Sequence, residues 1–139
     1  MILEGMVTSQ NESGELNIAP MGPQVDQGMT RFILRPFQTS RTFSNLKETR
    51  SGVFHVVDDV LLLAKSAIGT LQEIPETFPA EKISGRVLAS ACRWYEFQIE
   101  SIDESEARTV MQAKVIHRGR IRDYFGLNRA KHAVLEAAI

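Results

Sequence analysis

The sequence has little of several features that define common classes of protein. It contains one cysteine, Cys92, and three widely separated histidines, so neither a disulfide scaffold nor a metal site is expected. It has no apolar run of about 18 residues, the length needed to span a bilayer, and no basic residue in the first fifteen positions, unlike a signal peptide. We therefore expect a cytoplasmic protein with no metal ion and no membrane partner.

Short catalytic motifs are also missing. The chain has no G-x-G-x-x-G fingerprint, no G-x-x-x-x-G-K-[ST] phosphate loop, no G-x-S-x-G elbow and no H-E-x-x-H pair. These absences argue against a Rossmann dehydrogenase, a phosphate-loop nucleotidase, an α/β-hydrolase and a zinc peptidase.

The charge is nearly balanced, but it is unevenly distributed. The 139 residues include 16 basic and 17 acidic ones. Residues 31–50 hold five basic residues against Glu48 alone, and residues 114–131 hold six against Asp123 alone. A nucleic-acid-binding domain usually has a basic excess overall. The pattern therefore favours a small anion or an acidic partner surface, with an oligonucleotide-binding barrel as a weaker alternative and no nucleic-acid partner expected.

Turn residues and hydrophobic periodicity divide the chain into about six strands and two or three helices. A first hairpin is expected over 1–9 and 16–19, ending in an irregular loop at Pro20, and residues 70–84 are expected to form a loop because they contain two prolines. The other strands are predicted at 31–34, 52–57, 95–100 and 109–117, and the helices at 42–50, 60–68 and 128–139. This order indicates one mainly β (α+β) domain over 1–139, a small antiparallel barrel, whose last helix has the pattern of an element cut short.

The segment 35–45 is the most informative for function. It places the guanidinium groups of Arg35 and Arg41, the hydroxyls of Ser40 and Thr42, and the amide of Asn45 around the predicted start of a helix. The first N–H groups of a helix are unpaired and lie at its positive end, so this combination is suited to a phosphate group. The equally weighted alternative is that a hydroxyl merely caps the helix while the arginines are solvated.

A second candidate is the end of the first hairpin, N-I-A-P-M-G-P at 17–23. A strand that leaves its ladder at Pro20 exposes main-chain groups, and Gly22 allows a planar group to approach the backbone closely. Such an edge can bind a heteroaromatic ring. A simple turn is the alternative, and from this segment alone it is the stronger one.

The motifs N-I-A-P-M-G-P, S-R-T-F-S-N-L and G-V-F-H-V-V-D resemble those of FMN-binding split barrels of the flavin-reductase-like group. More closely, the chain resembles a conserved family of unknown function with that fold. The residues that carry this second resemblance are M-I-L-E-G at the start, N-I-A-P-M-G-P, D-D-V-L-L-L-A-K-S-A-I-G at 58–69, and G-L-N-R-A-K-H-A-V-L-E-A-A-I at the end.

The resemblance implies a split β-barrel that forms a homodimer with FMN near the subunit interface. By position, Thr42 and Asn45 correspond to the phosphate site, and Asn17, Ala19 and Met21 correspond to the strand end that lines the flavin ring. The function implied is an FMN-dependent oxidoreductase, linked by association to tetrahydromethanopterin one-carbon metabolism. A non-enzymatic flavin or pterin carrier is the alternative, because a fold does not establish an activity. Relatives continue past residue 139.

No side chain is marked by a motif as a catalytic acid or base. His55 and His132 are the candidates, although neither lies in a motif that fixes its role. Cys92 is expected to be a small core residue, and Trp94 to be a core or interface aromatic. The basic residues at 129–132 are either a cationic rim for an anionic substrate or a solvated helix face.

Overall fold

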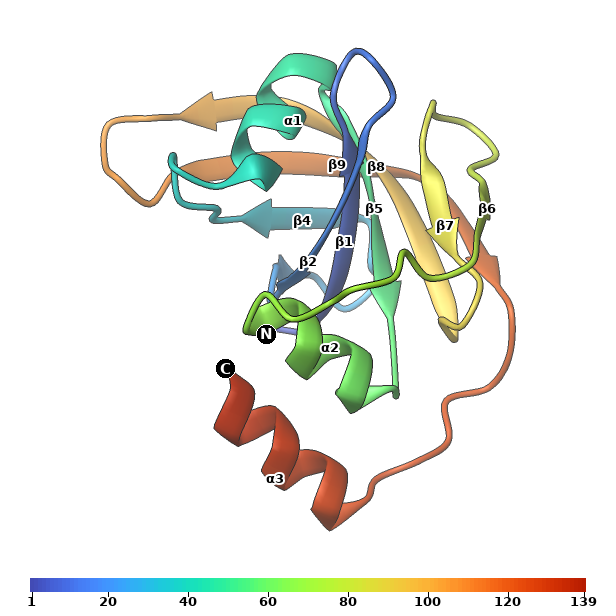
Figure 1. Cartoon of the computed structure of the whole chain (residues 1–139). Helices are drawn as coiled ribbons and strands as arrows, with labels where there is room; N and C mark the ends of the chain where they lie inside the picture. Colours follow the sequence, from blue (N-terminus) through green and yellow to red (C-terminus); the bar gives the residue numbers. More distant parts are fainter.

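The computed structural model describes residues 1–139 and consists mainly of antiparallel strands with three helices. Seven strands form one sheet in the order β2-β1-β5-β8-β9-β4-β3, while β6 and β7 form a separate pair (Figure 1). The strands are β1 (Gly5–Gln10), β2 (Leu16–Met21), β3 (Gln24–Val25), β4 (Arg31–Leu34), β5 (Ser51–Val56), β6 (Thr77–Pro79), β7 (Arg86–Leu88), β8 (Arg93–Asp103) and β9 (Val110–Arg120). The helices are α1 (Arg41–Thr49), α2 (Val60–Ala67) and α3 (Arg129–Ala138). The predicted mainly β class is confirmed.

The N-terminal segment closes the curved sheet. The predicted first strand began at residue 1, but β1 pairs with β2 and β5 only from Gly5 onward. The residues before it turn to β3 instead: Leu3 N donates to Pro23 O at 3.1 Å, and Val25 N donates to Met1 O at 2.8 Å. The chain therefore changes pairing partner at Glu4, next to the end of β2.

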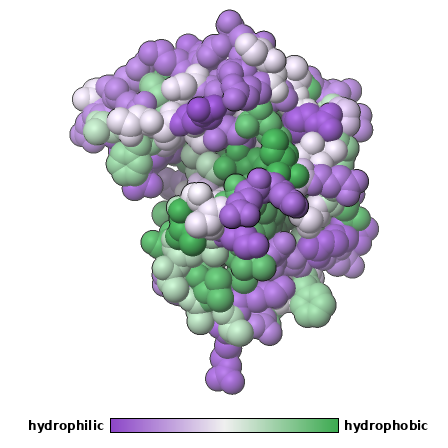
Figure 2. Space-filling model, in the orientation of Figure 1, coloured by the Kyte–Doolittle hydropathy of each residue, from purple (hydrophilic) through white to green (hydrophobic).

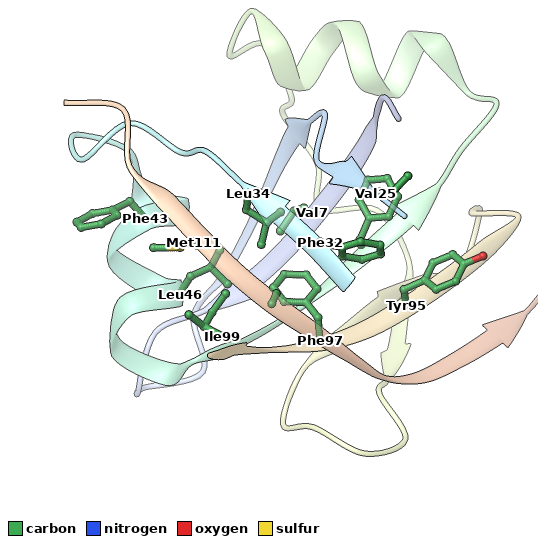
Figure 3. Packing of buried hydrophobic residues seen from close by; sticks show 12 residues of the cluster. Val7, Val25, Phe32, Leu34, Phe43, Leu46, Tyr95, Phe97, Ile99 and Met111 are labelled. Atoms are coloured by element: carbon green, nitrogen blue, oxygen red, sulfur yellow. The ribbon is translucent and has the colours of Figure 1, made fainter. Parts of the chain in front are cut away.

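The main core fills the inside of this curved sheet. Alternate residues of β4 and β8 point inward, and α1 covers one end with Phe43 and Leu46 (Figure 3). The ring of Phe32 makes edge-to-face contacts with three others, at centroid distances of 5.4 Å to Phe54, 6.0 Å to Tyr95 and 6.1 Å to Phe97.

Two side-chain hydrogen bonds fix α1 against the first hairpin. Asn17 Nδ2 donates to Thr42 Oγ1 at 3.1 Å, and one helical turn later Asn45 Nδ2 donates to Ser9 Oγ at 3.1 Å. Ser40 caps the helix by accepting from Phe43 N at 3.1 Å. The start of α1 is therefore held beside the end of β2, which is the arrangement on which the candidate site depends.

The predicted end of the second strand at Pro20 is wrong. In the structure β2 continues through Pro20 to Met21, and Pro20 pairs in register with Met6. The reason is that β2 is the edge strand of the sheet. Proline has no N–H to donate, and at an edge this position can face away from the neighbouring strand, so no hydrogen bond of the sheet is lost.

The predicted loop at 70–84 is also partly wrong, because β6 lies within it and pairs with β7. A buried carboxylate holds the turn between these two strands. Glu96 accepts from the main-chain N–H groups of Glu81 (2.8 Å), Lys82 (2.6 Å) and Ile83 (3.2 Å), and also from Trp94 Nε1 (2.9 Å). Burial raises the pKa of Glu96, but these hydrogen bonds outweigh it and leave the pKa below its ordinary value.

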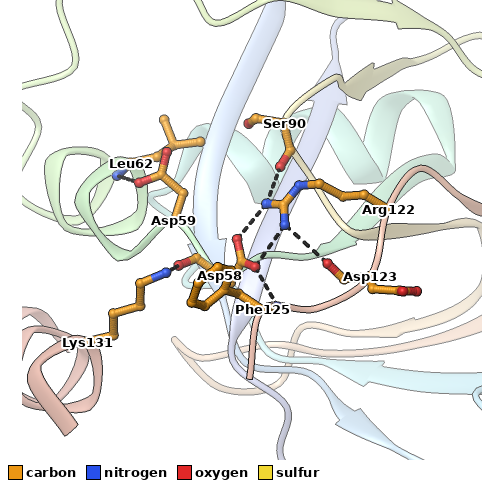
Figure 4. Close-up of polar contacts among 8 residues, drawn as sticks. All are labelled: Asp58, Asp59, Leu62, Ser90, Arg122, Asp123, Phe125 and Lys131. Atoms are coloured by element: carbon orange, nitrogen blue, oxygen red, sulfur yellow. Dashed lines mark hydrogen bonds and ion pairs between the residues drawn. The ribbon is translucent and has the colours of Figure 1, made fainter. Parts of the chain in front are cut away.

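The segment after β9 is anchored by an ion pair. Arg122 binds the carboxylate of Asp58 through both of its terminal nitrogens, at 2.9 and 2.5 Å, and Phe125 N donates to the same carboxylate at 2.9 Å (Figure 4). The Arg122 guanidinium is the main cause that holds the pKa of Asp58 well below its usual range. This anchor brings α3 against α2. None of the three helices is long and apolar enough to cross a bilayer.

Candidate functional site

A cavity of about 330 Å³ lies where the first hairpin, the segment after β4 and the start of α1 meet. It is lined by Ile2, Glu4, Ala19, Pro20, Met21, Gly22, Arg35, Pro36, Phe37, Ser40, Thr42, Arg108 and Ile139. The two ends of the chain meet at this cavity, consistent with their closeness in Figure 1. A larger hollow of about 680 Å³ beside α2 has three carboxylates and one lysine in its lining, so it does not suit an anion.

The α1 end of the cavity carries unused hydrogen-bond donors. The N–H groups of Arg41 and Thr42 lie in the first turn of the helix and have no protein acceptor. Of these two residues, Thr42 lines the cavity and Arg41 does not. Thr42 is only 3% exposed. Its hydroxyl accepts from Asn17, and no protein group takes the hydroxyl hydrogen. An oxyanion in the cavity would satisfy this hydroxyl.

Two arginines from different parts of the chain add positive charge to the same cavity. Arg35 follows β4 directly, and its guanidinium makes no ion pair with any carboxylate. Arg108 precedes β9, donates through Nε to Arg35 O at 3.0 Å, and stacks on the ring of Phe37 at 5.3 Å. The terminal nitrogens of Arg108 also make no ion pair. Both guanidinium groups are therefore available to a ligand anion.

The opposite end of the cavity is formed by the edge of the sheet. Ala19, Pro20 and Met21 belong to the edge strand β2, and Gly22 follows them. A Cβ at position 22 would lie 2.7 Å from Oε1 and 2.8 Å from Oε2 of Glu4. The planar carboxylate of Glu4 thus lies close against the main chain at Gly22, and because it is the far end of a flexible side chain it can move to admit another flat group there.

The nine residues predicted for the cofactor fall into two groups. Six of them line this one cavity: Ala19, Met21, Gly22, Arg35, Ser40 and Thr42. The other three do not. Asn17 and Asn45 use their amides to tether α1, and Arg41 lies outside the lining with Nη1 3.6 Å from Oε1 of Glu15. Their roles toward a cofactor stay predictions.

Three residues of the cavity lining, Arg108, Phe37 and Glu4, were not predicted from the sequence. Arg108 lies outside both basic segments, and it reaches the cavity because Phe37 and Arg108 form a bridge between distant parts of the chain. Glu4 is placed by the change of strand partner described above. No local pattern marks either position.

His55 is a structural residue, and its candidacy as a catalytic base is not supported by its surroundings. It is fully buried, Nε2 accepts from Leu88 N at 2.9 Å, and Nδ1 contacts Met6 O at 3.1 Å. Because Nε2 is an acceptor, Nδ1 carries the hydrogen and the ring is neutral. Burial lowers the pKa of His55 to about 4, although the bond to Met6 opposes the shift. Cys92 is buried, as predicted.

The chain belongs to the family described as "Protein of unknown function (DUF447) N-terminal domain", whose model matches residues 3–122. The family resemblance seen in the sequence motifs is thereby confirmed. No curated protein matches the chain.

Three solved structures show the same fold. The FMN-bound protein MM1853 from Methanosarcina mazei is 24% identical and superposes with a TM-score of 0.79, over 99% of this chain and 72% of that one. The 2-nitrobenzoate 2-nitroreductase NbaA from Pseudomonas fluorescens is 16% identical, with a TM-score of 0.70 over 84% and 64% of the two chains. The NADH:FAD oxidoreductase SgcE6 from Streptomyces globisporus is 14% identical, with a TM-score of 0.70 over 84% and 69%. These matches confirm the predicted split barrel.

Proposed function

We propose that the chain binds FMN in the 330 Å³ cavity, with the phosphate at the start of α1 and the flavin ring along the edge of β2. The observation that carries the proposal is the nearly buried hydroxyl of Thr42, whose hydrogen has no protein acceptor, beside two unpaired amides and two unpaired guanidinium groups. The FMN-bound relative MM1853 supports the choice of ligand.

The donors present suffice for a useful affinity. A hydrogen bond to a charged group contributes on the order of 1.5–3 kcal/mol net, and micromolar binding requires about 8 kcal/mol. The Thr42 hydroxyl, the Thr42 amide, Arg35 and Arg108 provide four such contacts. Both arginines are exposed, so their shares lie at the lower end of that range. The ring adds apolar contact with Met21 and close approach at Gly22.

We infer that the protein is an oxidoreductase in which bound FMN supplies hydride or electron transfer. The residues of this chain bind the phosphate, align the ring along Ala19 to Gly22, and exclude water with Ile2 and Phe37. The oxidoreductases NbaA and SgcE6 have this fold and support the inference. The alternative, a flavin or pterin carrier, requires the same cavity without turnover.

We also propose a homodimer with the cavity near its interface. Ile2 and Phe37 at the cavity mouth are exposed, as is Ile139, and large apolar side chains grouped on a surface often mark an interface. Sedimentation of the protein over a range of concentrations tests this, and a monomer at all of them would contradict it.

Titration with FMN and riboflavin tests the phosphate assignment, because the two ligands differ only in the phosphate. We expect FMN to bind at least about tenfold more tightly, with quenching of flavin fluorescence. Thr42→Val and Arg35→Gln should each reduce this preference about tenfold. Thr39→Val and Arg50→Gln are matched controls, because both residues are exposed and neither lines the cavity, and neither should change it by more than about twofold.

Two further assays separate the functional alternatives. Oxidation of NADH or NADPH by the FMN-loaded protein supports the oxidoreductase, whereas tight FMN binding without turnover by any donor supports the carrier. Displacement of FMN by a reduced pterin tests the predicted link to tetrahydromethanopterin. A preference for riboflavin over FMN would contradict the whole assignment.

A further inference from the structure

A second cavity, of about 430 Å³, lies between α2, α3 and the ends of β1 and β5. Eight of its twelve lining residues are apolar, including Leu63 of α2 and Leu135 of α3. Two of these eight, Tyr124 and Leu127, are the exposed part of the lining, with 47% and 84% of their surface accessible. Figure 2 shows apolar surface gathered over α2 and α3. An apolar hollow of this size with uncovered apolar residues at its entrance is typical of a ligand site.

The α3 side of this second cavity carries basic side chains that make no ion pair. Lys131 Nζ donates to the carbonyl of Asp58 at 3.0 Å and lies over the ring of Phe125, but it makes no ion pair (Figure 4). His132 is exposed and makes no side-chain hydrogen bond. The carboxylate of Asp58 is fully used by Arg122 and Phe125 N. Lys131 and His132 are therefore free to bind an acidic group.

Glu4 connects the two cavities. It lines both of them, whereas Ile2 lines only the first and Leu3 only the second. The carboxylate oxygens of Glu4 lie against Gly22, which lines the first cavity and not the second. The N-terminal segment around Glu4 is therefore a wall that the two cavities share.

We propose that the second cavity binds the substrate, and that this substrate is a flat, largely apolar compound with one acidic group. The ring system of the substrate packs against the apolar lining, and its acidic group binds to Lys131 and His132. The assignment as a substrate site rests on the proposed flavin function, because the site is adjacent to the ring position. The binding chemistry itself can be tested without flavin.

The probe is 8-anilinonaphthalene-1-sulfonate, a fluorescent fused ring with one acidic group, compared with its neutral analogue N-phenyl-1-naphthylamine. We expect one saturable site per chain, with tighter binding of the sulfonate. Leu135→Asp should abolish binding of both compounds, whereas Val134→Asp, a change on the neighbouring residue outside the lining, should leave both unchanged. Lys131→Gln should reduce the preference for the sulfonate about tenfold, and Arg129→Gln should not.

Three results would overturn the proposal. The first is sulfonate binding that Leu135→Asp leaves intact, which would place the probe elsewhere. The second is a preference for the sulfonate that is unchanged in Lys131→Gln while thermal unfolding shows the variant folded. The third is probe binding that strengthens on dilution of the protein, because a second copy would then cover the cavity.

The same protein tested with FMN keeps this proposal separate from the proposed function. If FMN fails to bind while the sulfonate binds as described, the second cavity is a ligand site without a flavin partner. If both bind, the sulfonate should shift the absorption spectrum of bound FMN in the wild type, and the shift should be lost in Leu135→Asp. A saturated second cavity with no effect on the flavin spectrum would contradict its role as the substrate site.

Discussion

Acid should destabilise this protein through His55 in a way that can be calculated. The folded protein holds His55 neutral, with its pKa lowered from 6.5 to about 4, mainly by burial. The unfolded chain therefore binds more protons than the folded chain between these two pH values. The contribution of His55 to the free energy of unfolding is fully present above pH 6.5 and is lost as the pH falls toward 4.

The size of the effect follows from the two pKa values. Between pH 7.5 and 4.5 the linkage relation gives a loss of about 2.5 kcal/mol from His55 alone, a large share of a typical unfolding free energy of about 5–15 kcal/mol. Urea unfolding of the wild type and of His55→Gln at several pH values measures it. Glutamine cannot titrate, and its amide oxygen can accept from Leu88 N in place of Nε2.

We expect His55→Gln to be less stable than the wild type at pH 7.5, and the difference to shrink by about 2.5 kcal/mol at pH 4.5. A difference between wild type and His55→Gln that stays constant over this range would refute the reasoning. Loss of flavin turnover in a folded His55→Gln protein would restore His55 as a catalytic candidate.

The remaining predictions concern contacts that hold the fold together. Asp58→Asn should cost about 1–3 kcal/mol because it breaks the paired contacts with Arg122, and faster proteolysis after β9 would report it. Gly119→Ala should destabilise by about 1–3 kcal/mol or more, since its Cβ would lie 2.1 Å from the ring of Trp94; an unchanged melting temperature would contradict this. Glu96→Gln should raise hydrogen exchange of the three amides in the β6–β7 turn, and unchanged exchange would show that the carboxylate does not hold it.

The parts of the site that were predicted from the sequence are those that depend on local structure. A helix start needs a capping hydroxyl, and Ser40 provides it. A strand that ends near a glycine exposes main chain at the sheet edge, and Gly22 does so. Local rules indicated Gly22, Arg35, Ser40 and Thr42, whereas Ala19 and Met21 came from the family resemblance, and all six line one cavity.

The missed parts depend on contacts between distant segments. Arg108 lies 73 residues from the carbonyl of Arg35 that it binds, and no periodicity in either segment indicates their pairing. Glu4 reaches the cavity because the chain switches strand partners there. β6 and β7 were missed for the same reason, since a distant carboxylate, Glu96, stabilises their turn.

The position of the last helix was predicted more reliably than its burial. The helix predicted at 128–139 is present as α3, and its apolar residues recur at helical spacing, but no residue of α3 is buried. These apolar residues are only partly covered, through Leu135, which lines the second cavity. Periodicity identifies which residues share a face of a helix, whereas the amount of protein packed against that face depends on tertiary contacts.

A crystal structure of the protein with FMN tests the central claim most directly. We expect the phosphate oxygens to lie within about 3 Å of the Thr42 hydroxyl and of the amide nitrogens of Arg41 and Thr42, with the guanidinium of Arg35 beside them and the ring along the edge of β2. A phosphate bound instead by the basic residues of 114–131, with the donors of α1 left unpaired, would contradict the account.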